Sequence, residues 1–239
     1  MSDGGDDREL RERLDEVDAL RRRVLNVIPH ALRTPITTLR GLAAAMATAS
    51  DEEIRTVIAP ALTRLATQSE HLLDDMLIAA GYTTALPTSP TVPTPVVPAA
   101  RAVWSELGVG DLQVTGDESL EVLAPGGTMF KVMVHLLDNA VKYGAPPHVV
   151  DVTRQGASVV VEVCSGGHVS PAEVPMFGEP FFRAEAAVMQ SAGLGVGLAV
   201  ARRLVEQAGG TVSIIAPAEG GLVVRLVMIA ADGAGDPAP

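Results

Sequence analysis

The feature that most constrains this chain is a proline-rich stretch near its middle. Residues 83–98 read TTALPTSPTVPTPVVP, with five prolines and no charged side chain. Proline lacks a backbone N–H and fixes φ at about −65°, so this run fits neither a helix interior nor a central strand. We predict a linker here. It divides the chain into a first domain at 1–82, the linker at 83–98, a second domain at 99–230 and a flexible tail at 231–239.

Composition excludes several classes of protein. The chain is 47% hydrophobic, enough to bury real cores, and its 29 acidic against 18 basic residues give a net charge of −11. Such a charge repels nucleic-acid phosphates and anionic lipid headgroups. A single cysteine excludes an intramolecular disulfide, and no apolar run reaches the length of a membrane helix. The acidic start, MSDGGDDREL, lacks a secretory pattern. We therefore expect a cytoplasmic protein with no nucleic-acid partner and no direct membrane insertion.

Two amphipathic helices are predicted in the first domain. The first has an apolar stripe from Leu10 to Ile28, and the second begins after Ser50, a good N-cap residue, and ends at Gly81. A short turn at 47–51 makes them an antiparallel hairpin that leaves one apolar face uncovered. A homodimer would cover that face by forming a four-helix bundle.

Mixed periodicities in the second domain predict an α+β sandwich. Alternating or β-rich runs predict strands at 112–115, 120–123, 148–153, 158–164, 211–215 and 221–229. Helical spacing predicts helices at 128–143 and 194–208, the latter closed by two glycines. A turn at Gln155 and Gly156 makes the two central runs a hairpin.

A histidine motif lies on the first predicted helix. Residues 30–35 read HALRTP, and the His30 imidazole is a good nucleophile near neutral pH. The string resembles the phosphoacceptor box of bacterial sensor histidine kinases. The resemblance implies that His30 accepts a phosphoryl group and that Thr34 helps orient water for dephosphorylating a partner. For Thr34, a hydroxyl bonded back into the helix is the alternative. The sequence departs from the family at Pro29 and at Ala31, where an acidic residue usually follows the histidine.

A second motif, residues 135–143, reads HLLDNAVKY. On a helix, His135, Asn139 and Lys142 share one face, so a metal ligand and an ammonium group would project together. The string resembles the N box of the same kinases, within the GHKL ATPase fold shared with gyrase and Hsp90. The resemblance implies that Asn139 holds Mg²⁺, with Lys142 near phosphate and Tyr143 near the nucleotide. His135 stands where a second asparagine is common, which weakens the predicted metal site of Asn139 and His135 without abolishing it.

A glycine-rich string follows nearer the C-terminus. Residues 193–198 read GLGVGL, and glycines before a helix let backbone N–H groups approach phosphate oxygens. The nucleotide-binding residues predicted here are Gly193, Leu194, Gly195 and Gly197. Residues 178–183, GEPFFR, resemble the F box of the family, so the residues between Ala184 and Ala192 resemble a short ATP lid.

The adenine-binding box of the family, Asp-x-Gly-x-Gly, is degenerate here. An ungapped alignment places Cys164 on the aspartate and Gly166 on the first glycine, with His168 on the second. A shift by one residue makes Ser165 the counterpart and keeps a better strand alternation, and both frames stay open. Neither side chain is a carboxylate, which could cost about 1.5 to 3 kcal/mol of nucleotide binding. Two ligands, Cys164 and His168, are too few for a zinc site.

These motifs follow one another in the family's order from about Arg21 to Ile229. The resemblance implies the core of a sensor histidine kinase with ATP and Mg²⁺ as cofactors, autophosphorylating His30 and passing the phosphoryl group to an aspartate of a response-regulator receiver domain. Implied partners are a second copy, the receiver domain and, as an open alternative for signal input, a separate sensory protein. Two alternatives remain: a pseudokinase or docking scaffold that binds ATP weakly, and an anti-sigma-type Ser/Thr kinase, which would not need the His30 hairpin.

Overall fold

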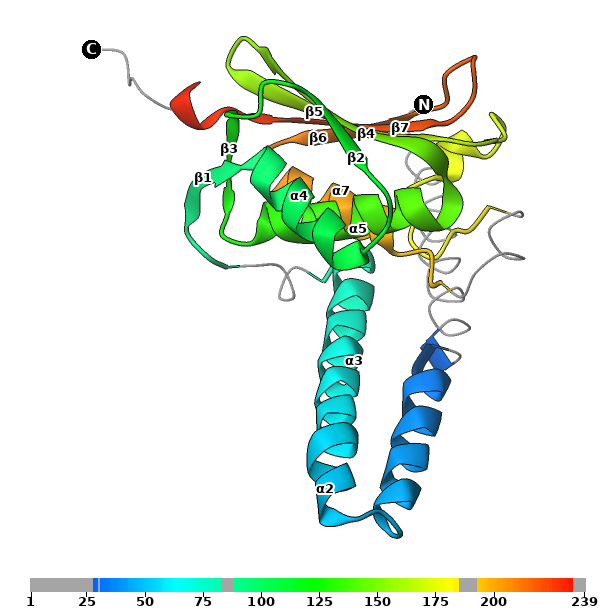
Figure 1. The fold of residues 1–239 in the computed structure, drawn as a ribbon. Helices are drawn as coiled ribbons and strands as arrows, with labels where there is room; N and C mark the ends of the chain where they lie inside the picture. Colours follow the sequence, from blue (N-terminus) through cyan, green and yellow to red (C-terminus); the bar gives the residue numbers. More distant parts are fainter. Residues whose placement is uncertain (1–27, 30, 83–87, 185–192, 234–239) are drawn as a thin grey trace, which may run out of the picture. The chain divides into compact units, whose positions relative to one another are not determined.

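A computed structural model describes residues 28–29, 31–82, 88–184 and 193–233 (Figure 1). The chain divides at Ala80 and Gly81 into two compact units. The predicted stripe from Leu10 to Val24 lies outside the described residues. None of the described helices is long and apolar enough to cross a membrane.

The first unit is the predicted helical hairpin. One helix covers residues 31–46, and a turn leads to a second helical stretch formed by α2 (Asp51–Glu53), the π-helical turn η1 (Ile54–Ile58) and α3 (Ala59–Ala79). Ser50 caps it as predicted, because its Oγ accepts from Glu53 N while the Glu53 carboxylate accepts from Ser50 N at 2.9 Å. The π-helical turn ends two residues before Pro60, whose missing N–H interrupts the α-helical bonding.

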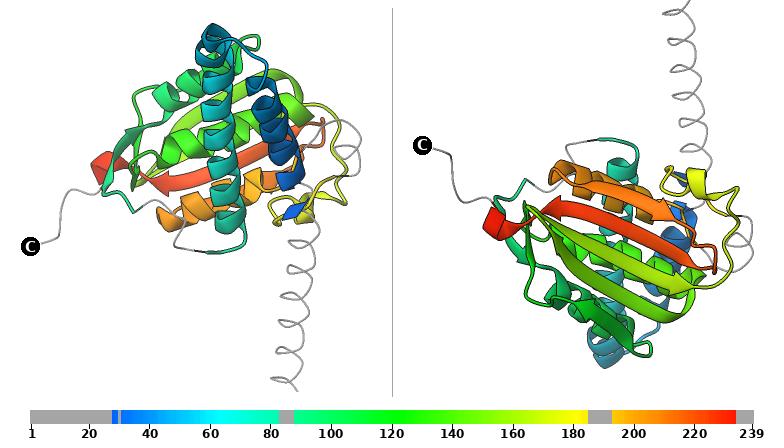
Figure 2. Two further views of the ribbon diagram at one scale, coloured as in Figure 1. Left: turned by 90° about the horizontal axis from the view of Figure 1, so that it is seen from below. Right: turned by 90° about the horizontal axis from the view of Figure 1, so that it is seen from above.

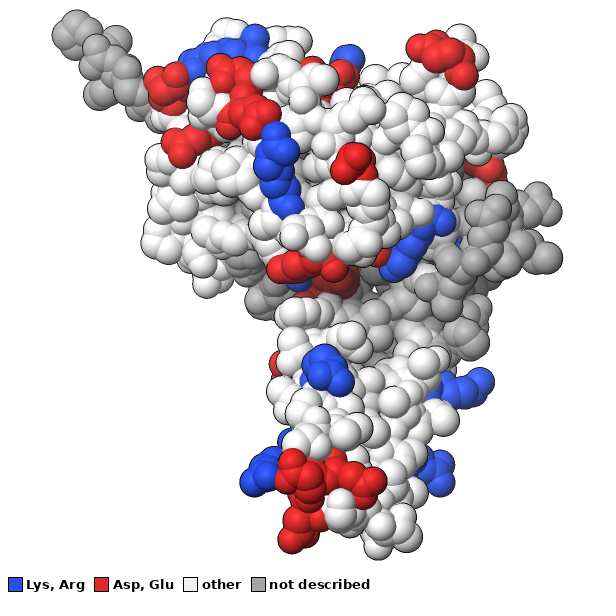
Figure 3. Space-filling view, viewed as in Figure 1, with Lys and Arg blue, Asp and Glu red and all other residues white. Residues whose placement is uncertain are grey.

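Apolar side chains remain exposed on the hairpin, as the sequence predicts. Five large hydrophobic residues are 41–60% exposed: Ile36, Leu39, Met46, Val57 and Leu73. Acidic side chains gather at the tip of the hairpin (Figure 3), where the first turn of α2 carries Asp51, Glu52 and Glu53. Negative charge at this helix N-terminus is favourable to the helix dipole.

The second unit is an α/β sandwich, which confirms the predicted fold class. Its five-stranded sheet has the order β2-β4-β5-β7-β6, in which only β2 and β4 run parallel. The strands are β2 (Leu112–Gly116), β4 (Ala145–Gln155), β5 (Ser158–Gly166), β7 (Leu222–Ile229) and β6 (Thr211–Ile215). A separate pair joins β1 (Thr91–Pro95) to β3 (Glu121–Pro125).

Helices α4 (Val96–Leu107), α5 (Thr128–Tyr143) and α7 (Gly197–Gln207) cover one face of the sheet (Figures 1 and 2). The core forms between them because each strand turns alternate apolar side chains toward the helices. Its fully buried members include Val150, Val152, Val159, Val161 and Leu226 from the sheet and Met129, Val132, Met133, Leu137, Val200 and Leu204 from the helices. No described helix covers the opposite face, which the right-hand view of Figure 2 presents in front.

The predicted linker is corrected over its second half. Residues 91–95 form strand β1, and helix α4 begins at Val96, so the second unit starts before residue 99. Prolines are tolerated here because β1 is in a two-stranded edge pair and Pro98 lies in the first turn of α4, where no intrahelical donor is needed. Residues 83–87 lie outside the described residues.

Two smaller boundaries also differ from prediction. Helix α7 begins at Gly197, so residues 193–196 form a loop before it. The predicted tail begins with the short helix η4 (Ala231–Gly233), where Asp232 pairs with Arg154. That guanidinium lowers the pKa of Asp232, chiefly through hydrogen bonding. Residues 234–239 lie outside the described part of the chain.

Candidate nucleotide site

Helix α5 carries the central group of predicted site residues. Its inward face is apolar, so the polar residues of the second motif are left on the outer side. His135, Asn139 and Tyr143 recur every fourth residue and form one half-buried stripe that spans about 12 Å of helix. Lys142 lies beside this stripe and is exposed.

The glycine-rich loop lies along this stripe. A Cβ atom on Gly193 would stand 2.5 Å from Tyr143 Oη, and one on Gly197 would stand 3.5 Å from His135 Nδ1. The loop therefore meets both ends of the stripe, and Asn139 occupies the middle turn of the helix between them. A side chain at position 193 would displace Tyr143. The fold thus brings together the α5 motif and the glycine-rich loop, which lie some fifty residues apart in the sequence. The sequence predicts both as parts of one site.

Lys142 is held by a neighbouring carboxylate. Its Nζ lies 2.7 Å from Asp138 Oδ2 one turn earlier, and both side chains are partly exposed. An exposed pair of this kind contributes only about 0.3–0.5 kcal/mol to the helix. A phosphate group can therefore compete with Asp138 for the ammonium at small cost.

The F-box segment packs against the same loop and is hydrogen-bonded to it. The Phe181 N–H donates to the Gly195 carbonyl at 2.9 Å, and a Cβ atom on Gly195 would stand 2.3 Å from the Phe182 carbonyl oxygen. Gly195 has a φ of +69°, so this close approach requires glycine in both space and backbone conformation. The Phe182 ring stands 6.0 Å from that of Phe177. The predicted lid lies outside the described residues, apart from its first residue, Ala184.

The end of β5 faces the end of α5 through Ser165. A Cβ atom on Gly144, which follows α5, would stand 2.6 Å from Ser165 Oγ, so the serine side chain points toward the helix end. Gly166 is equally confined, since a Cβ atom added there would stand 2.9 Å from the Pro146 carbonyl oxygen. The alternation through buried Val161 and Val163 continues to Ser165, as the second alignment frame requires.

Cys164 lies on the other face of the sheet, which corrects its prediction as a cofactor-binding residue. It pairs with Val149 of β4, two residues along each strand from the Asp151–Glu162 pair, so the two pairs share a face of the sheet. Burial raises the pKa of the Cys164 thiol first, and the charges of Glu162 and Asp151 raise it further. The alternation of β5 therefore separates Cys164 from helix α5 and the glycine-rich loop.

The first unit holds the predicted phosphoacceptor motif. His30 lies outside the described residues, and Thr34 is exposed on the helix covering residues 31–46. The Thr34 carbonyl accepts from Thr38 Oγ1 at 3.1 Å. Thr34 is therefore available at the surface of this unit.

The donor set around Asn139 suits a hard cation shared with a ligand rather than a protein-only site. Within the described ranges, no three His, Cys, Asp or Glu side chains gather as a metal site. Magnesium typically keeps waters and binds through one or two protein oxygens together with substrate phosphates. An asparagine oxygen beside a glycine-rich loop fits that pattern, whereas Cys164 and His168 bring no further ligands.

Comparison with known proteins agrees with this geometry. Residues 125–231 match the family model of the histidine kinase-, DNA gyrase B- and HSP90-like ATPases. A bacteriophytochrome of Pseudomonas aeruginosa is 28% identical over 83% of this chain, and the sensor protein KdpD of Mycobacterium tuberculosis is 28% identical over 92% of it. The chain spans about a quarter of the length of these relatives, 28% and 27%.

A solved structure extends the match to the fold of both units. The histidine kinase AdeS of Acinetobacter baumannii has a TM-score of 0.56 at 18% identity, covering 84% of this chain and 97% of its own. The ATPase match covers α5, β5 and the glycine-rich loop, and the relatives extend through the hairpin. The chain therefore carries a domain of the histidine kinase-, DNA gyrase B- and HSP90-like ATPases and is similar to sensor histidine kinases over most of its length.

Proposed function

We propose that this chain is a catalytic core that binds Mg-ATP in its second unit, autophosphorylates His30 and passes the phosphoryl group to an aspartate of a response-regulator receiver domain. The observation that carries the proposal is the half-buried stripe of α5 met at both ends by the glycine-rich loop. Backbone N–H groups at the start of α7 would bind phosphate oxygens there, helped by the helix dipole.

Individual residues take the following parts. The Asn139 carboxamide oxygen would hold Mg²⁺ with His135 beside it, Lys142 would shift from Asp138 to phosphate, and Tyr143 would border the nucleotide. Bound Mg²⁺ supplies neutralisation of charge on the phosphate oxygens. A His30 ring nitrogen attacks the γ-phosphorus, the bond to the bridging oxygen breaks, and ADP leaves. No carboxylate follows His30, so the imidazolium proton goes to water or another base.

Ser165 is the residue that would meet the purine in place of the family's aspartate. A hydroxyl can accept from an adenine amino group, but it carries no charge, and hydrogen bonds to charged groups are worth about 1.5–3 kcal/mol. We expect nucleotide binding weaker than an aspartate would give. This observation also favours a second candidate, a pseudokinase that keeps the hairpin as a docking scaffold but binds no nucleotide.

Calorimetric titration with a non-hydrolysable ATP analogue separates the two candidates. We expect binding that strengthens with Mg²⁺ and weakens at least tenfold in Asn139→Ala. Gln155→Ala is a matched control, because that carboxamide lies at the opposite end of the β4–β5 hairpin from Ser165. Absence of binding at millimolar nucleotide, by a protein with unchanged circular dichroism, favours the scaffold.

Labelling with γ-labelled ATP then tests the phosphoacceptor. We expect acid-labile label that is lost in His30→Gln and retained in His71→Gln, which changes an exposed histidine of the same unit. Label that survives acid and persists in His30→Gln would instead indicate a Ser/Thr kinase. Transfer from labelled protein to isolated receiver domains tests the last step.

A further inference from the structure

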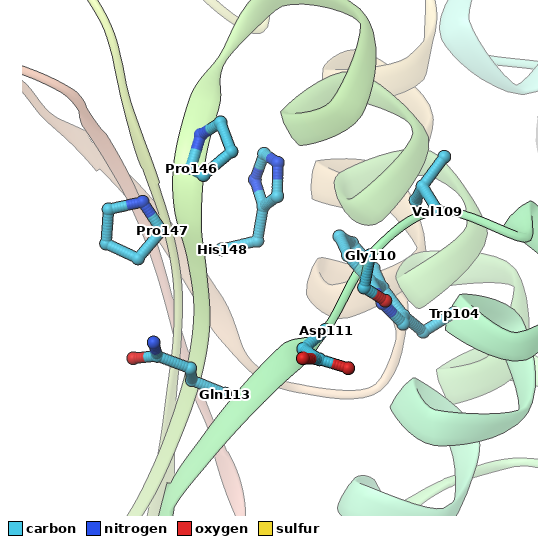
Figure 4. A pocket seen from close by; sticks show the side chains of 8 residues that line it. All are labelled: Trp104, Val109, Gly110, Asp111, Gln113, Pro146, Pro147 and His148. Carbon is cyan, nitrogen blue, oxygen red and sulfur yellow. The ribbon is translucent and has the colours of Figure 1, made fainter.

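A pocket of about 540 Å³ opens at the end of α4, next to the beginnings of β2 and β4 (Figure 4). Its size is within the usual range for small-molecule sites, roughly 300–1,000 Å³. The lining side chains come from the α4–β2 connection and from the start of β4: Trp104, Val109, Gly110, Asp111, Gln113, Pro146, Pro147 and His148. The glycine-rich loop and the polar stripe of α5 contribute none of them, so this pocket is separate from the candidate nucleotide site.

Four of the eight lining residues carry rings. The indole of Trp104 and the imidazole of His148 have centroids 5.2 Å apart and are tilted by 54°, and two proline rings stand beside them. Figure 4 shows the His148 ring between the prolines and the turn at Gly110, with the Asp111 carboxylate and the Gln113 amide on the β2 side. Such walls suit a planar apolar ring, because flat rings pack by offset or edge-to-face contact.

The walls are fixed before any ligand binds. Trp104 Nε1 donates to the Gly110 carbonyl at 3.0 Å, which ties the α4–β2 connection to the helix. Gly108 ends α4 with a φ of +63°, and consecutive prolines restrict the opposite wall. Ligand binding therefore costs little conformational entropy at this site.

The polar groups of the pocket favour a cation. Asp111 is exposed and brings a carboxylate, whereas none of the described residues that line the pocket is a lysine or an arginine. Within the described part of the chain, His148 Nδ1 is buried and has no hydrogen-bond partner, so the imidazole contributes a ring wall to the pocket and no charge. Burial lowers the pKa of His148, which keeps the ring uncharged at neutral pH. The indole face adds attraction for positive charge.

We propose that this pocket is a binding site for small aromatic cations, molecules that pair a planar ring with an amidinium or ammonium group. The ring packs among Trp104, His148 and the prolines, while the charged nitrogen faces the Asp111 carboxylate. The proposal does not depend on nucleotide binding, because none of the residues that carry it belongs to the candidate nucleotide site.

The single tryptophan of the chain makes the test specific, because Trp104 emission reports directly on this pocket. The full chain is titrated with benzamidine, excited at the red edge of tryptophan absorption. We expect a saturable change in emission with a dissociation constant in the millimolar range or below. Benzamide, which has the same ring and no charge, is expected to bind at least tenfold more weakly.

Two variants locate the charge that matters. Asp111→Asn is expected to weaken benzamidine at least tenfold and to leave benzamide unchanged. Glu106→Gln is the matched control, since it removes an exposed carboxylate from α4 outside the pocket, and it is expected to leave benzamidine binding unchanged. The proposal is overturned by a response that does not saturate up to 10 mM, by equal responses to benzamidine and benzamide, or by unchanged binding in Asp111→Asn.

Discussion

The Cys164 thiol lies on the sheet face that no described helix covers, in a row of charged neighbours. On the same face, Arg225 Nε lies 2.7 Å from Glu162 Oε1, and Asp151 pairs across the strands with Glu162. Burial is the first cause of the raised pKa of Cys164, and the two carboxylates add to it. Because the thiolate is the nucleophilic form, we expect this cysteine to react slowly with electrophiles at neutral pH.

Alkylation of Cys164 by iodoacetamide tests that environment. We expect slow reaction at pH 7.5 that accelerates as the pH rises toward 9. In Glu162→Gln the loss of one negative charge lowers the pKa of the thiol, so the rate at pH 7.5 rises a few-fold. Glu121→Gln, an exposed carboxylate of β3 away from this row, leaves the rate unchanged. Equal rates in the two variants would contradict the electrostatic account.

His148 makes the stability of the second unit depend on pH. Burial lowers the pKa of His148 below its ordinary value of 6.5, so below that pH the unfolded chain binds a proton that the folded chain resists. The stabilising contribution is complete above about pH 6.5 and is lost as the pH falls toward the folded value, with a slope of at most about 1.4 kcal/mol per pH unit.

Urea unfolding at pH 7.5 and 5.5, followed by Trp104 emission, measures this effect. The free energy of unfolding should fall less between the two pH values in His148→Gln than in the parent chain. His71→Gln, on the exposed side of α3, keeps the parent's dependence. A parental slope in His148→Gln would show that another group controls the pH response.

At the scale of elements, strand β1 and helix α4 turn a proline-rich stretch into part of the second unit. Val96 and Val97 are 0% and 2% exposed, whereas Val92 in β1 is 40% exposed. The buried pair fixes the start of α4 in the core, and the prolines on either side of it need no ladder or helix donor.

Substitution of these valines tests that assignment. Val97→Ala is expected to lower the free energy of unfolding by about 1.5–3 kcal/mol through lost burial and a residual cavity. Val92→Ala removes the same atoms from an exposed position and should change it by less than about 0.5 kcal/mol. Urea titration measures both variants: a loss in Val97→Ala as small as that in Val92→Ala would mean that residues 91–98 behave as the linker that their composition predicts.

At the scale of the whole molecule, the exposed apolar face of the hairpin calls for a partner surface. Leu39 is 48% exposed and Leu73 is 50% exposed, each from a different helix of the first unit. Large apolar side chains exposed on both helices favour an interaction site, and a second copy forming a four-helix bundle would bury them.

Light scattering on the purified chain tests the homodimer. We expect a mass of twice 24.8 kDa for the parent chain and a shift toward monomer in Leu73→Glu, because a charge would be buried in the bundle. Gln68→Glu adds the same charge at an exposed polar position of α3 and should leave the mass unchanged. A monomeric parent at micromolar concentration would contradict dimerisation through this face.

The sequence by itself determined the hairpin, the α+β class and the bounds of α5, because 3.6-residue and two-residue apolar periods, caps and glycines act locally. It also indicated the resemblance to sensor histidine kinases, since the motifs that carry it are short local strings in a fixed order. Only the tertiary structure decided which of Cys164 and Ser165 faces α5, because one residue of register reverses every side chain of a strand. Likewise, only packing against β3 and α5 made residues 91–98 part of a strand and a helix. Only the fold brought Trp104 next to His148, because contacts between distant segments do not produce a periodic pattern in the sequence.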